Sequence, residues 1–286
     1  MKSSLLTVVQ TLSDGGYDVT VYPTKDRGDA TKKILTLKND EYEKIVVCGG
    51  DGTLNEVISG IMQTDIDLSL GYIPAGTLNE WSTGLHISKN IPTAAKDILS
   101  GHTVKLDIGK FGDKYFSYTA SFGAFTEASY SAPQDIKNVL GQAAYFFEGV
   151  KSIGNIKPVH LKFTYDDGEI EGDFLFGAIS NSMSVGGVVK FKEAMVKLND
   201  GLFEVLLIRK PTNVMDFQPI IDGILRQDLN RSGIEFFHTK ELTVSGGKDV
   251  SWTLDGEYAA GEQSITVENI KRAINFIVPD ELEILN

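Results

Sequence analysis

Residues 44–60 read Lys-Ile-Val-Val-Cys-Gly-Gly-Asp-Gly-Thr-Leu-Asn-Glu-Val-Ile-Ser-Gly. An apolar, β-branched run ends at two glycines, and apolar residues then recur at helical spacing as Leu54, Val57, Ile58 and Ile61. This pattern predicts a strand, a tight turn and a helix. Glycine lets another group approach the backbone closely, and a helix N-terminus presents N–H groups that lack helical partners. A phosphate suits such a turn, although a plain connecting turn can have the same composition.

The stretch from residue 69 to residue 87 repeats the pattern of strand, glycine-containing turn and helix. Gly52-Thr53-Leu54-Asn55-Glu56 returns there as Gly76-Thr77-Leu78-Asn79-Glu80. Turns that follow neighbouring parallel strands meet at one edge of a sheet, so the two turns are expected to line one crevice. In each repeat a Thr precedes a Glu by three residues, which is also the pattern of a capping box at a helix start. The two interpretations are compatible, because a capped helix end can still face a ligand.

The two turns, residues 49–56 and 73–80, resemble the catalytic domain of the diacylglycerol kinase family, which includes bacterial lipid kinases and sphingosine kinases and is related to NAD kinases. The resemblance implies an α/β N-terminal domain with a parallel doubly wound sheet and a β-rich C-terminal domain. It implies an ATP-dependent kinase that uses Mg²⁺ and phosphorylates a hydroxyl of diacylglycerol or a similar lipid. The nucleotide-binding residues that it implies are Thr24, Gly49, Gly50, Asp51, Gly52, Thr53, Asn55, Glu56, Gly76, Thr77 and Glu80.

Two stretches in the second half extend the resemblance. Residues 194–205 resemble a segment that holds a structural magnesium ion through the side chain of Asp200 and the backbone carbonyls of Lys197 and Leu202. Oxygen ligands suit this ion, which keeps several waters, although Asn-Asp-Gly before a strand is also a common turn. Residues 252–258, Trp-Thr-Leu-Asp-Gly-Glu-Tyr, resemble the segment of the catalytic base. The implied catalytic residues are Glu257 as the base, with Asp51 and Asp255 organising catalytic metal and water.

Three features depart from the family pattern. Glu80 and Asn199 stand where Asp is usual, and nothing in residues 1–16 resembles the family's first strand and its Asn-Pro-x-Ser-Gly phosphate loop. In doubly wound sheets the first strand is interior, so its absence is expected to leave an open slot beside a strand over residues 17–22. The sequence therefore suggests a shortened chain that binds ATP weakly. An NAD kinase-like enzyme and a non-catalytic nucleotide- or lipid-binding protein are the alternative functions.

Composition places the chain among soluble globular proteins. It has 286 residues, 39 acidic and 27 basic, and a net charge of −12. This charge disfavours nucleic acid as a partner and broad adhesion to anionic lipid. The single cysteine, Cys48, cannot form an internal disulfide and fits a cytoplasmic protein. No run is long enough to span a membrane, so a lipid substrate would be reached peripherally from the water side. A homodimer is left open.

The remaining elements define the expected domains. Helices are expected over 4–14, from about 30 to 38 and over 91–101, with the strand over 17–22 between the first two. Strands are expected over 103–111, 114–122, 159–165, 170–179 and 201–208, with hairpin turns at residues 111–114 and 166–168. A helix over 135–152 is expected to pack on the sheet rather than to cover a lipid slot. The predicted domains are 1–102 and 103–286, with the active site in the cleft between them.

Overall fold

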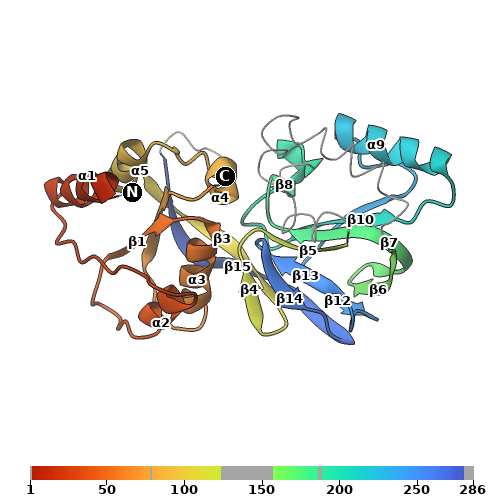
Figure 1. Cartoon of the computed structure of the whole chain (residues 1–286), viewed down its shortest axis with the longest axis horizontal. Helices are drawn as coiled ribbons and strands as arrows, with labels where there is room; N and C mark the ends of the chain where they lie inside the picture. Colours follow the sequence, from red (N-terminus) through yellow and green to blue (C-terminus); the bar gives the residue numbers. More distant parts are fainter. Residues whose placement is uncertain (1, 78, 124–156, 186–188, 280–286) are drawn as a thin grey trace. The chain divides into compact units, whose positions relative to one another are not determined.

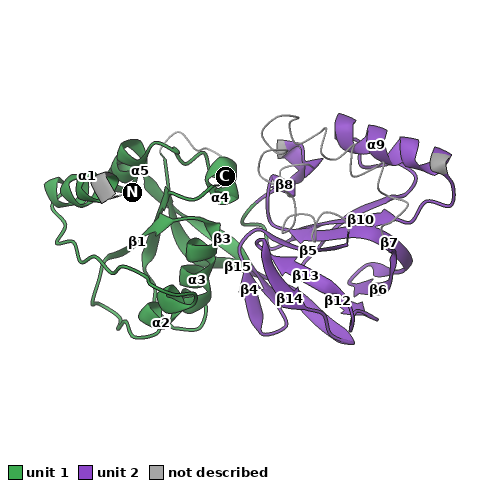
Figure 2. Cartoon of the chain, in the orientation of Figure 1, with its two compact units in different colours: residues 1–108, 198–200, 271–286 green, residues 109–197, 201–270 purple. Residues whose placement is uncertain are grey.

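The computed structural model describes residues 2–77, 79–123, 157–185 and 189–279. The chain forms two compact units, shown in Figure 2. Unit 1 comprises residues 1–108, 198–200 and 271–286, and unit 2 comprises residues 109–197 and 201–270. The sequence placed everything after residue 102 in one domain, whereas the last strand returns to unit 1. The helix expected over 135–152 lies outside the described residues.

Parallel strands form the centre of unit 1. Strand β1 (Lys44–Gly49) pairs in parallel with β2 (Ser69–Pro74), and β2 pairs in parallel with the end of β15 (Ser264–Val278). Figure 1 shows helices α1 and α5 on one side of these strands and α2 and α3 on the other. The other elements of the unit are α1 (Lys2–Asp14), α2 (Asp29–Ile34), α3 (Asp51–Ile61), α4 (Glu80–Gly84), α5 (Ile91–Ser100) and the first part of β3 (His102–Phe111).

Helix α3 buries the face that its sequence predicts. Leu54, Val57, Ile58 and Ile61 are all at most 6% exposed. Burial of such a side chain stabilises a fold by about 1.5–3 kcal/mol. The same helix therefore has one face fixed in the core while its N-terminus stays at the end of β1.

The strand expected over residues 17–22 does not form. Residues 17–25 lie in neither a helix nor a strand, and Val21 and Tyr22 are 45% and 53% exposed. Alternating apolar residues favour an extended backbone, but a strand also needs a hydrogen-bonded neighbour. Among the described residues, β2 is the strand that pairs with β1, so no ladder reaches this segment. The helix expected to continue to about residue 38 ends at Ile34.

Unit 2 is built almost entirely of antiparallel strands. Both expected hairpins form, because Phe111 pairs with Lys114 and Tyr165 pairs with Gly168. The strands are β4 (Lys114–Phe116), β5 (Thr119–Gly123), β6 (Val159–Tyr165), β7 (Gly168–Ser180), β8 (Ser184–Val185), β9 (Val189–Lys190), β10 (Phe203–Arg209), β11 (Ile234–Thr239), β12 (Glu241–Ser245), β13 (Ser251–Leu254) and β14 (Glu257–Ala260). The described part of the unit also contains the short 3₁₀ turns η2 (Glu193–Met195) and η3 (Val214–Asp216) and helix α9 (Phe217–Arg226).

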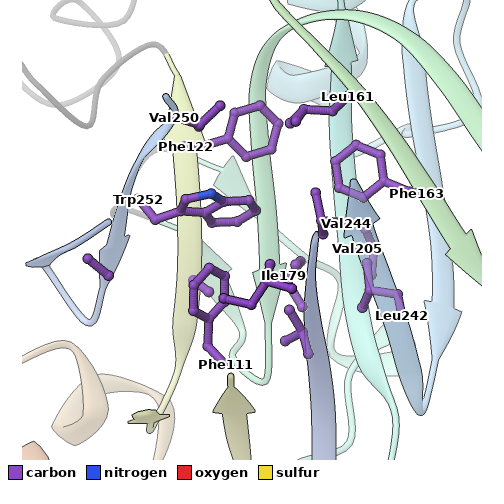
Figure 3. Close-up of a cluster of buried hydrophobic side chains, with 14 of the residues drawn as sticks. Phe111, Phe122, Leu161, Phe163, Ile179, Val205, Leu242, Val244, Val250 and Trp252 are labelled. Atoms are coloured by element: carbon purple, nitrogen blue, oxygen red, sulfur yellow. The ribbon is translucent and has the colours of Figure 1, made fainter. Parts of the chain in front are cut away.

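Aromatic side chains fill the core of unit 2, as Figure 3 shows. Trp252 of β13 is 1% exposed, and its ring centroid lies 4.8 Å from that of Phe122 and 4.9 Å from that of Phe111. Tilted aromatic pairs at this separation add to the stabilisation that burial provides. This packing anchors β13, and with it the turn into β14. No helix in the described part of the chain is long and apolar enough to cross a membrane.

Candidate active site

The turns that follow β1 and β2 touch through their backbones. The N–H of Ala75 donates to the carbonyl of Gly49 at 2.8 Å. A Cβ atom added to Gly76 would lie 2.5 Å from the Cα atom of Gly50. The prediction that both turns share one edge of the sheet is confirmed, and the close approach explains why glycine stands in both.

Helix α3 begins earlier than the sequence suggested. Its N-cap is Gly50 and its first residue is Asp51, and no side chain caps its N-terminus. The capping box of Thr53 with Glu56 is therefore wrong, because Thr53 already lies inside the helix. The first N–H groups of a helix have no intrahelical acceptor. In α3 these groups belong to residues 51–53, directly after the two glycines.

Asp51 directs its carboxylate at the start of α4. Its Oδ2 accepts the N–H of Glu80 at 3.2 Å. Burial raises the pKa of Asp51 above its ordinary value, and the nearby backbone N–H groups of Glu80, Trp81 and Asn79 act against that rise. Its Oδ1 is buried and has no hydrogen-bond partner among the described residues. A buried carboxylate oxygen without a partner is a suitable ligand for a divalent cation or a water.

The second turn folds back on itself through Asn79. Its Oδ1 accepts the N–H of Gly76 at 3.0 Å and the hydroxyl of Tyr72 at 3.1 Å, and its Nδ2 donates to the Gly76 carbonyl at 2.8 Å. Asn79 is the N-cap of α4 in the left-handed region, with φ 53°. The capping box of Thr77 with Glu80 is therefore also wrong. Thr77 is exposed on this turn.

Glu56 lies on α3 but contacts a different segment. Its carboxylate accepts the N–H of Gly28 at 2.7 Å and that of Ala30 at 3.2 Å. Asn55 accepts the hydroxyl of Ser59 one turn further along the helix, at 3.3 Å. Thr24 is exposed in the irregular segment before α2. The structure thus groups Gly49–Thr53 with Gly76 and Thr77, and it engages Glu56 elsewhere.

The proposed base belongs to the hairpin of β13 and β14 in unit 2. Asp255 and Gly256 have φ values of 50° and 83°, as in a two-residue type I′ turn, and Glu257 follows them. The buried Asp255 carboxylate accepts the N–H groups of Ser117, Tyr118 and Thr119 at 2.5, 2.9 and 3.0 Å. Glu257 itself is exposed.

These bonds also explain a break in the sheet. The strand expected over 114–122 divides into β4 and β5 at Ser117 and Tyr118, since their N–H groups bond to Asp255 instead of to a neighbouring strand. The role of Asp255 that these contacts show is to hold the turn that carries Glu257.

The segment from Lys197 to Leu202 leads into β10, with Gly201 in the left-handed region at φ 84°. Among the described residues, no three His, Cys, Asp or Glu side chains gather as metal ligands. The magnesium site expected at Lys197, Asp200 and Leu202 has one carboxylate and two backbone carbonyls as ligands. A search for three such side chains therefore does not test it.

Asp107 is a polar residue that sequence reasoning missed. It is fully buried on β3, its N–H donates to the carbonyl of Leu198 at 2.9 Å, and its Oδ1 accepts the N–H of Arg272 at 2.6 Å. The signal in the sequence is an acid within an otherwise apolar strand, Leu106-Asp107-Ile108. Because Leu198 lies between Lys197 and Asp200, Asp107 fixes one point of that segment.

Comparison with known proteins identifies the family of the chain. A family model described as the diacylglycerol kinase catalytic domain matches residues 1–111. The chain is 31% identical over 283 residues to a diacylglycerol kinase of Staphylococcus saprophyticus, covering 99% of this chain and 92% of that protein. It is also 31% identical over 272 residues to a diacylglycerol kinase of Staphylococcus aureus strain Newman, covering 95% of this chain and 85% of that protein.

Solved structures share the fold over almost the whole chain. A protein from Bacillus anthracis superposes with a TM-score of 0.80 at 25% identity, covering 97% of this chain and 90% of that one. A crystal structure of a diacylglycerol kinase from the same organism superposes with a TM-score of 0.73 at 21% identity, which shows the shared fold.

The fold and the paired glycine turns define a phosphotransferase of the lipid kinase class. The chain belongs to the diacylglycerol kinase family. The NAD kinase-like and non-catalytic alternatives are not favoured by these similarities.

Proposed function

We propose that the chain transfers the γ-phosphoryl group of ATP to the hydroxyl of diacylglycerol or a closely similar lipid. The observation that carries this proposal is the backbone contact between Gly50 and Gly76 at the N-terminus of α3. No side chain caps the start of α3 in the described part of the chain, and such a helix start favours phosphate. The names of the relatives supply the lipid class.

The nucleotide phosphates are proposed to lie against residues 50–53, with Gly76 and Thr77 on the opposite side. Small residues and N–H donors suit a phosphate that must approach a backbone closely. Thr24 is proposed to contact the nucleotide from the segment before α2.

Mg²⁺ is proposed at two places, and the ion would neutralise phosphate charge when bound. Asp51 supplies a carboxylate oxygen that is buried and lacks a partner, which fits a ligand of the catalytic ion. The carboxylate of Asp200 and the carbonyls of Lys197 and Leu202 supply the oxygen ligands of a structural ion. Asp200→Ala should then lower the melting temperature and remove its dependence on Mg²⁺. Equal melting temperatures of the unaltered chain in saturating Mg²⁺ and in chelator would argue against the structural site.

Glu257 is proposed to accept the proton of the lipid hydroxyl. As the hydroxyl oxygen attacks the γ-phosphorus, the bond from phosphorus to the ADP oxygen breaks and the proton moves to the carboxylate. Glu257 is exposed, as a group that must meet a lipid headgroup has to be, and Asp255 holds the turn before it. A lipid substrate resides in a bilayer, so the proposal includes a cytoplasmic protein that binds the membrane peripherally.

The test is phosphate transfer from radiolabelled ATP to a mixture of diacylglycerol vesicles, sphingosine and NAD, followed by separation of the products. The proposal predicts label in phosphatidic acid, and Glu257→Gln should lower the rate by about a hundredfold or more with ATP binding retained. Glu262→Gln removes a charge from an exposed residue nearby in the sequence and should leave the rate unchanged. Label in NADP, or no label despite ATP binding, would overturn the proposed function.

A further inference from the structure

Helix α3 carries two acids, five residues apart, and each bonds to the backbone at the start of a different helix. Asp51 bonds to an N–H group at the start of α4, and Glu56 bonds to N–H groups at the start of α2. The two carboxylates differ in how many of their oxygens accept a hydrogen bond. The Oδ1 of Asp51 is buried without a partner, whereas both oxygens of Glu56 accept hydrogen bonds.

The bonds of Glu56 join segments that are far apart in sequence. Its carboxylate accepts from Gly28 and Ala30, and its backbone carbonyl accepts the hydroxyl of Thr31 at 2.7 Å. Gly28 has φ 83°, a conformation that glycine adopts at little cost. Three bonds therefore hold the start of α2 to the middle of α3.

A second carboxylate shapes the residues just before Gly28. Asp29 accepts the N–H groups of Lys25 and Asp26, each at 3.0 Å. The bond from Asp26, followed by that from Lys25, lowers the pKa of Asp29. The segment 25–31 is thus fixed internally by Asp29 and fixed to α3 by Glu56.

Close packing holds the other end of α2. A Cβ atom added to Gly60 of α3 would lie 2.7 Å from the Cβ of Ile34, and Ile34 is 4% exposed. Helix α2 is therefore fixed to α3 at both ends, by polar bonds at its start and by close packing at its last residue.

We propose that Glu56 is a positioning residue. It fixes the position of the segment 24–30 along the axis of α3, so that Thr24 contacts the bound nucleotide. The proposal rests on the proposed function. A rise of 1.5 Å per residue places Glu56 about 7.5 Å along the axis from Asp51, away from the phosphate end. Because both oxygens of its carboxylate accept N–H groups at the start of α2, Glu56 is placed to affect ATP through the position of Thr24.

The experiment is a double-mutant cycle on ATP affinity with Glu56→Gln, Thr24→Ala and the combined variant. Each single variant should weaken ATP binding, by about tenfold for Glu56→Gln. The ATP affinity of the combined variant should be close to that of the single variant that binds ATP more weakly. Glu43→Gln removes an exposed charge from unit 1 and should leave ATP affinity unchanged. Losses that multiply in the combined variant would overturn the proposal, because they would mean that Glu56 acts independently of Thr24.

Amide hydrogen exchange supplies a readout that does not need ATP. In Glu56→Gln the amides of Gly28 and Ala30 should exchange faster, while those of Gly52 and Thr53 should keep their rates. Unchanged exchange at Gly28 and Ala30 would overturn the proposal. Failure of the unaltered chain to bind ATP would instead contradict the proposed function, and the exchange rates would still report whether Glu56 holds the segment.

Discussion

The same five residues, Gly-Thr-Leu-Asn-Glu, occur twice in unit 1 and adopt two different structures. In the first repeat, residues 52–56 all lie within α3. In the second repeat Asn79 is a left-handed N-cap, and Glu80 is the first residue of the five-residue helix α4. The two sequences are identical, so the difference in structure must come from the residues around each repeat.

Contacts that the two repeats do not share decide where each helix begins. In the second repeat Gly76 lies against Gly50, and the side chain of Asn79 bonds to both the N–H and the carbonyl of Gly76. The N–H of Glu80, the first residue of α4, then bonds to the Asp51 carboxylate. An anion of the protein therefore already lies at the start of α4, whereas the start of α3 has no side-chain cap and is where the phosphates of ATP are proposed to bind.

Substitution of Gly76 should produce the largest effect. Gly76→Ala places a Cβ atom 2.5 Å from the Gly50 Cα, so the turns must separate, and ATP affinity should fall more than about tenfold. Stability to urea should fall by about 1–3 kcal/mol. Gly84→Ala is the matched control, because a Cβ atom there meets no atom within 4 Å. Equal ATP affinity and equal stability of the two variants would show that the contact between the turns contributes to neither.

The two asparagines give the next largest difference. Asn79→Ala removes an acceptor and a donor from the buried turn, which should cost about 1–2 kcal/mol of unfolding free energy. Asn55→Ala changes the corresponding residue of the first repeat, which lies on a partly exposed helix surface, and should lower the unfolding free energy by less than about 1 kcal/mol. Urea unfolding of both variants measures this directly. Similar losses of unfolding free energy in the two variants would contradict the expectation that the two asparagines contribute differently to stability.

The smallest expected effect is a pH dependence at Asp51. Its folded pKa lies above the ordinary 3.8, so ionisation of Asp51 weakens the fold as pH rises through the folded pKa. The unaltered chain should gain stability relative to Asp51→Asn as pH falls from about 7 to about 4. Urea unfolding of both chains across this range measures the difference. A constant difference, or one of opposite sign, would mean that burial does not dominate at this carboxylate.

Sequence reasoning succeeded where the signal is local and periodic. The run from β1 through the glycines into α3 formed as predicted, because helical spacing of apolar residues directly specifies a buried face. Both hairpins formed for a similar reason, since glycine with Asp favours tight turns.

Sequence reasoning failed where a distant residue decides the outcome. Glu56 stands in the same motif as the turn residues, yet its carboxylate bonds to N–H groups of residues 28 and 30, which the sequence pattern does not indicate. Residues 17–22 have the alternation of a strand and lack a paired neighbour among the described residues. The separate roles of Asp51, Asp107 and Asp255 depend on backbone groups far away in sequence, which a pattern search does not see.

The most direct test of the account is an amide spectrum of the labelled protein titrated with Mg²⁺–ATP. We expect large shift changes for the amides of residues 50–53 at the start of α3, where the phosphates are proposed to bind. Changes for Glu80 should be smaller, because its N–H bonds to the Asp51 carboxylate and not to a phosphate. Large changes at Glu80, with residues 50–53 unmoved, would contradict the claim that identical sequences serve different purposes in the two turns.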